Sequence, residues 1–490
     1  MESQSKLQII YPYEEEGTPP HPHCPHGPTL LFKMPTVDGD EQIGAYYACS
    51  AHRDKHLCNF YMAVEEVTPK QLTRRYELEE YIAELKKQRR KLKNTHEGDK
   101  LHYCLDCNVP LLPEEQSDHS IHEIFRDVSE NFMHNPTRFL RPLQNDKVQA
   151  QYFFDNRALN FFTNCFLDLG INKVVCIGAP RLHAHLRNTC HYVKSFLLDF
   201  DYRMFHFYDD CFAWYNMCNN HFFDDAQRQE FDEFLMCTPT EHIMIFTDPP
   251  FGCRTELIAG TLRQITRLYN AINQLPHQPL AIFWIFPYFS EHHVQQEMPH
   301  MRMCDYKVNY TNHTSYTNVG EKGRKLGSPV RVFTNIPLEL LHLPIEEEYK
   351  YCASCQRYTA LENRHCVKCN MCPSKNGSTY QHCDLCGCCV KPNYVHCKTC
   401  RRCTQAEEHE CEMFQANQYC WICLQKGHTE FGCIEWRKHC KHTPFVGCSD
   451  KEIICLLCRR RGHNERNCTQ RSKYLEEFKF LGSTQVKFKG

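Results

Sequence analysis

Cysteine is the residue that most constrains how this chain can fold. The sequence has 34 cysteines in 490 residues, and 21 of them follow residue 350, many beside histidines. The N-terminal segment, MESQSKLQIIYPYEEEG, has neither the basic nor the apolar part of a secretory signal, so we do not expect a disulfide framework. Thiolates and imidazoles are the ligands that Zn²⁺ prefers, and the cysteines are therefore predicted to hold zinc.

Composition limits the remaining possibilities. Hydrophobic residues make up 42% of the chain, enough for one sizeable core with smaller modules attached. The longest apolar run, LAIFWIFPYF at 280–289, has about half of the roughly 20 residues that cross a bilayer, so no membrane segment is expected. The formal net charge is −2, and any attraction to nucleic acid must come from local basic clusters.

Two zinc modules are predicted before the core. Residues 20–64 contain a candidate set of three cysteines and one histidine, whose spacing beside YY and NFY resembles the GRF-type zinc finger, a module that binds single-stranded nucleic acid. Residues 99–130 contain a C2H2-like set in which the two histidines are one residue closer together than in the usual finger. Zinc binding is therefore predicted, but recognition of the DNA major groove is not. The predicted ligands are Cys24, His26, Cys49 and Cys58 in the first module and Cys104, Cys107, His119 and His122 in the second.

Residues 65–98, between these modules, are predicted to be a charged helical linker. Their basic run, KKQRRKLK at 86–93, has two interpretations: a solvated helix face, or a patch that contacts phosphates or directs nuclear import. The sequence does not decide between the two.

Residues 350–412 are predicted to be a multi-zinc domain. The motif His-Cys-x2-Cys-x2-Cys occurs three times, as HCVKCNMC, HCDLCGCC and HCKTCRRC, with further ligands on each side. There are enough ligands for three or four ions, but spacing does not assign each ligand to an ion. The candidates are Cys352, Cys355, His365, Cys366, Cys369, Cys372, His382, Cys383, Cys386, Cys389, His396, Cys397, Cys400, Cys403, His409 and Cys411.

The two segments 418–435 and 453–470 both fit Cys-x2-Cys-x4-His-x4-Cys and are predicted to be CCHC zinc knuckles. Such knuckles commonly place aromatic and basic side chains against single-stranded RNA. A further set between them, His439, Cys440, His442 and Cys448, is an open candidate, and the whole chain is expected to bind about seven to eight zinc ions. The knuckle ligands are Cys420, Cys423, His428, Cys433, Cys455, Cys458, His463 and Cys468.

The core, residues 145–345, alternates apolar strands with amphipathic helices, which predicts the α/β class and a Rossmann-like sheet. NKVVCIGAPRLHAHL reads as a strand, a glycine turn and a helix, without the Gly-x-Gly-x-x-Gly that cradles a pyrophosphate. S-adenosylmethionine has no phosphate and needs one small residue, which Gly178 supplies. It also needs a carboxylate after the next strand, for which Asp199 and Asp201 are candidates.

The stretch TDPPFG, which follows the apolar run HIMIF, is the strongest catalytic candidate. Ligands of open α/β sheets bind above the carboxyl ends of the strands. There Asp248 can accept a hydrogen bond from an amine, Pro249 and Pro250 restrict the backbone and aim a carbonyl, and Phe251 can stack on a flat ring. This combination suits methyl transfer to an amine attached to an aromatic base.

The glycine turn followed by DPPF resembles the amino methyltransferases that act on adenine N6. With CIGAPRLH, LLDFDYR, NMCNNHFFD, IFWIFPYF, GSPVRVFTNIP and the metal modules, residues 20–435 resemble the zinc-finger, CCHC-domain ribosomal RNA adenine N6-methyltransferases of animals. This resemblance implies S-adenosylmethionine as the cofactor, large-subunit ribosomal RNA as the substrate, and a location in the nucleus or nucleolus, with the cytoplasm as a second location. The chain departs from the family pattern in having two knuckles where one is expected.

The resemblance also implies site residues. Asp248 to Phe251 would hold the adenine, and the predicted cofactor site consists of Gln151, Tyr152, Phe153, Asp155, Gly178, Arg181, Asp199, Asp201, Asn216, Asn219 and Asp248. A loop with Lys322, Arg324 and Lys325 is either an RNA-gripping loop or a solvated one.

Two alternative functions stay open at this point: an RNA-binding protein with an inactive core, and a protein N-methyltransferase. The complete DPPF motif disfavours the first, and the knuckles disfavour the second. The sequence identifies no protein partner.

Overall fold

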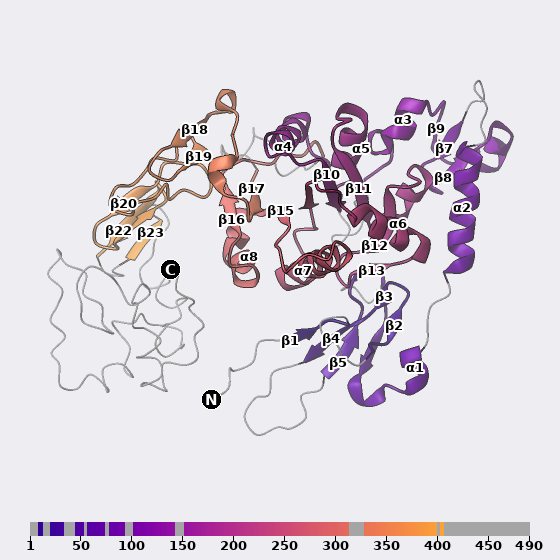
Figure 1. Ribbon diagram of the computed structural model, residues 1–490. Coiled ribbons are helices and arrows are strands. Elements are labelled where there is room, and N and C mark those ends of the chain that lie inside the picture. The colour runs from indigo at the N-terminus through magenta and orange to yellow at the C-terminus, as the bar shows by residue number, and fades with distance from the viewer. Residues whose placement is uncertain are drawn as a thin grey trace. The chain divides into compact units, whose positions relative to one another are not determined.

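The computed structural model describes residues 8–12, 20–33, 45–52, 56–73, 78–93, 101–142, 151–312, 328–398 and 402–405 (Figure 1). The chain divides into two compact units, one spanning Ser5–Glu347 and the other containing Glu348 and the residues after it. None of the helices within the described ranges is long and apolar enough to cross a membrane.

An eight-stranded sheet forms the centre of the first unit. The strand order is β13-β12-β11-β10-β14-β15-β17-β16. The five strands from β12 to β15 are parallel, while β13 and β17 pair antiparallel with their neighbours at the two ends of this parallel block. The strands are β10 (Lys173–Ile177), β11 (Lys194–Asp199), β12 (Phe212–Asn216), β13 (His221–Phe222), β14 (Ile243–Thr247), β15 (Ala281–Pro287), β16 (Arg302–Cys304) and β17 (Val330–Thr334).

Helices cover both faces of this sheet, which explains why its strands are continuously apolar. All residues of β10, β12 and β14 are buried, as expected for parallel strands packed on both sides. Figure 1 shows α4 and α5 on one side of the sheet and α7 on the other. The helices are α4 (Asn156–Asp168), α5 (Pro180–Thr189), α6 (Asp225–Leu235), α7 (Thr255–Ile272) and α8 (Glu291–Glu297). The predicted α/β core with attached Cys/His modules is confirmed at this level.

The N-terminal module is built from short antiparallel strands against the β13 end of the sheet. Four strands form a sheet in the order β1-β4-β5-β6, and β2 pairs with β3. Gly27 in β3 has a φ of +94°, and a Cβ there would lie 2.4 Å from the His221 ring of β13, so only glycine fits this contact. The strands are β1 (Gln8–Ile10), β2 (His23–Cys24), β3 (Gly27–Pro28), β4 (Leu30–Lys33), β5 (Ala45–Ala48) and β6 (Tyr61–Ala63).

The predicted linker contains two helices, α1 (Pro69–Thr73) and α2 (Glu79–Lys93). Three basic side chains of α2 form ion pairs with acids elsewhere in this unit. Lys86 pairs with Asp224 at 2.7 Å, Lys91 pairs with Glu115 at 2.5 Å, and Arg89 pairs with Asp209. Part of the basic run therefore attaches α2 to the core.

The second module follows α2. Its three strands, β7 (His102–Cys104), β8 (Val109–Leu111) and β9 (Ile124–Phe125), have the order β8-β7-β9, and α3 (Glu130–His134) comes after them. Tyr103 is buried and packs edge-on against Phe139, whose ring contacts Phe207 of the core. An aromatic cluster thus takes the place of a core within this small module.

Within residues 348–398 and 402–405, the second unit contains three two-stranded hairpins. They are β18 (Tyr349–Cys352) with β19 (Arg357–Ala360), β20 (Gln381–Cys383) with β21 (Cys388–Val390), and β22 (Tyr394–Cys397) with β23 (Arg402–Gln405). Two-stranded hairpins bury little apolar surface, so metal ligation is expected to stabilise this unit.

Candidate functional site

A cavity lies where the carboxyl ends of β10, β11, β12 and β14 meet. It encloses about 830 Å³ of empty space, part of which is open to solvent. Eleven predicted site residues line it: Gln151, Tyr152, Phe153, Gly178, Asp199, Asp201, Asn216, Asp248, Pro249, Pro250 and Phe251. Six lining residues were not predicted: Ala51, Pro180, Phe200, Met217, Cys218 and Cys253.

Gly178 brings two strands of the site together. It follows β10 with a φ of +65°, and its N–H donates to the Leu198 carbonyl at 2.9 Å. A Cβ at this position would lie 2.9 Å from Met217 Cε and 3.0 Å from the Asp248 carbonyl oxygen. Because glycine has no side chain, it can adopt this backbone conformation without strain. It also leaves the floor of the cavity open to a ligand.

The two acids at the carboxyl end of β11, Asp199 as its last residue and Asp201 two residues later, have different environments. Asp201 is 2% exposed, and its two oxygens accept hydrogen bonds from Arg203 Nε at 2.8 Å and Arg203 Nη2 at 2.7 Å. Asp199 Oδ1 accepts from the Asp201 N–H at 2.8 Å. Burial, with a further contribution from the Asp201 charge, raises the pKa of Asp199 to about 7. Of the two, Asp199 is the carboxyl group better suited to accept hydrogen bonds from a ligand.

Asp248 begins the DPPF segment directly after β14. Its N–H donates to the Ile177 carbonyl at 3.0 Å, which ties it to the end of β10. Its Oδ1 accepts a hydrogen bond from the Tyr310 hydroxyl at 2.9 Å. Burial raises the pKa of Asp248 well above its usual value, and the hydrogen bond from Tyr310 opposes this shift.

Aromatic rings surround this carboxyl group. Phe251 and Tyr152 are stacked with ring centroids 6.0 Å apart, and Tyr310 stacks on Phe154 at 5.1 Å. Tyr310 was missed by the sequence reasoning because it lies 62 positions from Asp248, and nothing in MRMCDYKVNY marks it. The rings of Phe251 and Tyr152 give the cavity a surface on which a flat base can stack.

Three predicted cofactor residues lie outside the cavity lining. Asp155 caps α4, with its Oδ1 accepting from the Ala158 N–H at 2.8 Å. Arg181 lies in the first turn of α5, where burial lowers its pKa. Asn219 is 2% exposed, and its Nδ2 donates to the Pro28 carbonyl of the N-terminal module at 2.7 Å.

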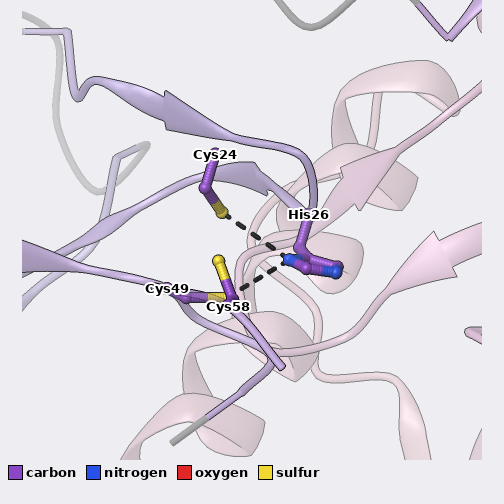
Figure 2. Close-up of side chains that lie close together, drawn as sticks. All are labelled: Cys24, His26, Cys49 and Cys58. Atoms are coloured by element: carbon purple, nitrogen blue, oxygen red, sulfur yellow. Dashed lines mark hydrogen bonds between the residues drawn. The ribbon is translucent and has the colours of Figure 1, made fainter. Parts of the chain in front are cut away.

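The first predicted zinc set is brought together by the fold. Figure 2 shows the thiols of Cys24, Cys49 and Cys58 directed toward the same point as the His26 imidazole. The four ligand atoms lie within 4.8 Å of one another, and His26 Nδ1 is 3.5 Å from Cys49 Sγ. Four thiolate and imidazole ligands at these separations fit tetrahedral zinc.

The second predicted set, Cys104, Cys107, His119 and His122, also has its ligand atoms within 4.8 Å of one another. In this set and in three Cys-x2-Cys turns of the second unit, at 352–355, 366–369 and 383–386, the residue after the second cysteine has a positive φ. These residues are Asn108, Gln356, Asn370 and Gly387. The shared turn geometry is that of a loop that directs two thiolates at one ion.

The second unit contains three clusters of metal ligands whose sequence ranges overlap. The three clusters are Cys352, Cys355, His365 and Cys372; Cys366, Cys369, His382 and Cys389; and Cys383, Cys386, His396 and Cys403. The pairs His365-Cys366 and His382-Cys383 are therefore each divided between two clusters. Cys397 is in none of these three, while Cys400, His409, Cys411, both knuckles, the set at 439–448 and the loop with Lys322 lie outside the described residues.

The interleaving follows from strand geometry. In the second and third hairpins, His382 lies opposite Cys389 and His396 lies opposite Cys403. Opposed residues share a face of the hairpin, whereas the next residue along the strand points to the other face. Cys383, which follows His382, is therefore directed to a different ion.

Comparison with known proteins identifies relatives of this chain. Residues 145–336 match the family model described as probable N6-adenine methyltransferase. The human protein named rRNA N(6)-adenosine-methyltransferase ZCCHC4 is 39% identical over 387 residues, covering 74% of this chain and 72% of the relative. The relatives of the same name from mouse and Xenopus laevis are 38% and 37% identical, covering 74% of this chain and 72% and 76% of their own lengths.

We expect Gly178→Ala to abolish or strongly weaken binding of the predicted cofactor, S-adenosylmethionine, measured by calorimetry. The added methyl group collides with the Asp248 carbonyl, and the positive φ costs about 1–2 kcal/mol. Gly170→Ala is a matched control, because Gly170 has a φ of +67° and a Cβ added there would meet nothing within 4 Å. Both variants should unfold at a lower temperature, but only Gly178→Ala should lose the ligand. Equal ligand affinity in the two variants would contradict the assignment.

Proposed function

The chain belongs to the family of rRNA N(6)-adenosine-methyltransferases, and we propose that it transfers a methyl group from S-adenosylmethionine to N6 of an adenosine in ribosomal RNA. The observation that carries this function is the DPPF segment, residues 248–251, at the carboxyl end of β14. It lines one cavity with Gly178 and Asp199 and presents a buried carboxyl group beside stacked aromatic rings.

We also propose that the core is a Rossmann-like methyltransferase fold. When the strands other than β13 are numbered from 1 to 7 along the chain, their order in the sheet is 3-2-1-4-5-7-6. Among these seven strands only the seventh, β17, is antiparallel to the others. Two features support the proposal: the helices on both faces and a cavity above the carboxyl ends of the parallel strands. β13 is an additional edge strand.

The cofactor half of the site would be formed by the turn after β10 and the acid after β11. When bound, S-adenosylmethionine supplies an electrophilic methyl group. Gly178 would let the backbone approach the cofactor closely, and Asp199 would accept hydrogen bonds from its ribose hydroxyls. Asp201 maintains the shape of this edge through its buried pair with Arg203.

The substrate half would be formed by DPPF. Asp248 and a backbone carbonyl of the diproline accept the two N–H hydrogens of the adenine amine, which aligns its lone pair with the methyl group. Phe251 stacks on the base. Tyr310 is a positioning residue, because its hydroxyl fixes Oδ1 of Asp248 and so sets the direction of the other carboxyl oxygen.

The metal clusters would have a structural role in this function. Each described cluster is a closed set of four protein ligands, which leaves no open coordination position for chemistry. We propose that zinc fills them and the knuckles, about seven to eight ions in all, and that the knuckles position the RNA. We also propose that the protein acts in the nucleus or nucleolus, because its proposed substrate is ribosomal RNA. Imaging of a fluorescent fusion tests this location.

Asp248→Asn tests the catalytic assignment directly. The variant keeps the size of the side chain but converts one acceptor oxygen into a donor, so methylation of ribosomal RNA should fall roughly 10²–10³-fold while calorimetry shows that S-adenosylmethionine still binds. Asp225→Asn makes the same chemical change on the exposed start of α6 and should have no effect. Near-normal turnover by Asp248→Asn would reject the assignment.

The pKa of Asp199 predicts a pH dependence of cofactor binding. The ionised carboxylate is the better acceptor for ribose hydroxyls, and a pKa of about 7 means that it is mostly protonated at pH 6. The dissociation constant should therefore rise about tenfold from pH 8 to pH 6. Asp199→Asn should bind more weakly and with a flat profile. Titration calorimetry across this range, with zinc content checked at each pH, measures the effect, and a flat wild-type profile would contradict it.

A further inference from the structure

A three-residue segment, residues 49–51, connects the first metal cluster to the cavity. Cys49, the residue after β5, is a cluster ligand, and Ala51, two residues later, lines the cavity. Ser50, which lies between them, is also buried. The same short loop thus contacts the cluster at one end and the cavity at the other.

Buried amide side chains hold this module against the core. Asn216, at the carboxyl end of β12, donates from Nδ2 to the His26 carbonyl at 2.9 Å and to Ser50 Oγ at 2.9 Å. Asn219 donates from Nδ2 to the His26 carbonyl at 3.1 Å and to the Pro28 carbonyl at 2.7 Å. His26 is a cluster ligand, so both amides depend on where the cluster places its backbone.

Apolar packing joins the same two sites. Phe200, the residue between the two cavity acids, lines the cavity and packs against Cys24, Cys49 and Ala51. Its ring centroid is 6.0 Å from that of His52, which in turn is 4.4 Å from the ring of His26. Displacement of the cluster ligands would therefore move Phe200, and with it the segment that carries Asp199.

We propose that the metal ion bound by Cys24, His26, Cys49 and Cys58 fixes one wall of the cofactor cavity, so that zinc and S-adenosylmethionine strengthen each other's binding. The inference rests on the proposed function for the identity of the cofactor. The module is too small to have a substantial core, and without the ion its ligands have nothing to hold them together. Loss of the ion would release the 49–52 loop and leave the Asn216 and Asn219 amides without fixed acceptors.

Cys58→Ala in the full-length protein tests this coupling, because Cys58 is a ligand but does not line the cavity. The variant should contain about one zinc ion less and bind S-adenosylmethionine about 5–150-fold more weakly, the range typical of coupled sites. Cys403→Ala is the matched control, because it removes the same kind of ligand from a cluster in the second unit. It should lose zinc without a change in cofactor affinity.

The rate of zinc release is a second measurement, and it does not depend on cofactor binding by a variant. Coupling between binding sites is reciprocal, so saturating S-adenosylmethionine should slow one phase of zinc transfer from the wild-type protein to a coloured chelator. That phase should be missing in Cys58→Ala and present in Cys403→Ala. If Cys58→Ala proves unstable to heating, this wild-type protection experiment decides the question alone.

The outcomes distinguish failure of the proposed coupling from failure of the proposed function. Weaker cofactor binding in Cys58→Ala but not in Cys403→Ala supports the coupling, and so does cofactor protection of the wild-type zinc phase that is missing in Cys58→Ala. Equal affinity in the wild type and a zinc-depleted, folded Cys58→Ala variant overturns the coupling and leaves the proposed function intact, as does zinc release unaffected by cofactor. Absence of S-adenosylmethionine binding by the zinc-loaded wild type overturns the proposed function itself.

Discussion

The parallel pairing of β10 with β14 is the contact on which the site depends. Ile177 lies opposite Thr247 in this pair, so the two strands end together. The turn after β10 and the DPPF segment after β14 therefore meet, and a glycine is required where Gly178 approaches the Asp248 carbonyl at a distance too short for a side chain. In the proposed function, the methyl donor and the accepting amine have separate binding elements, and this one strand pair would set the distance between them.

Both N-terminal modules are attached to the core near the carboxyl ends of β11 and β12. The first is attached through Asn216 and Asn219, and the second through Arg203, whose Nη1 donates to Asn108 Oδ1 at 3.3 Å. Arg203 is 3% exposed, and its Nη2 also reaches Gln151 Oε1 at 3.3 Å. A buried guanidinium needs all of its partners in place, so docking of the second module and ordering of residue 151 are linked through one charge.

Local patterns in the sequence predicted the parts of this arrangement that depend on local chemistry. Gly178, Asp199 and the DPPF segment follow apolar strands, and strand ends of a parallel sheet converge, so their meeting could be anticipated. The ligands of the first two metal clusters were predicted for a similar reason, since the Cys and His spacings favour one grouping. Ala51 and Tyr310 carry no local signal, because distant segments bring them to the cavity.

The ligands of residues 352–403 show a different limit of sequence reasoning. The spacing of the repeated His-Cys pairs does not assign each ligand to an ion, whereas strand geometry does, because adjacent residues of a strand point to opposite faces. The register of the hairpins, with His382 opposite Cys389 and His396 opposite Cys403, decides the assignment, and that register is not visible in the spacing. Asn219 is a similar case, because the side chain implied to border the cofactor instead donates to the Pro28 carbonyl.

The first module also covers the lateral edge of the sheet beyond β12. A parallel sheet that ended at β12 would leave one row of backbone groups unpaired beside the cavity. β13 pairs with β12, and Gly27 of β3 lies against His221 of β13, so the module covers this edge. A segment that closes the sheet there is necessarily close to the carboxyl end of β12 and therefore to the cavity. The proximity of the first metal cluster to the cofactor site thus follows from how the sheet is closed.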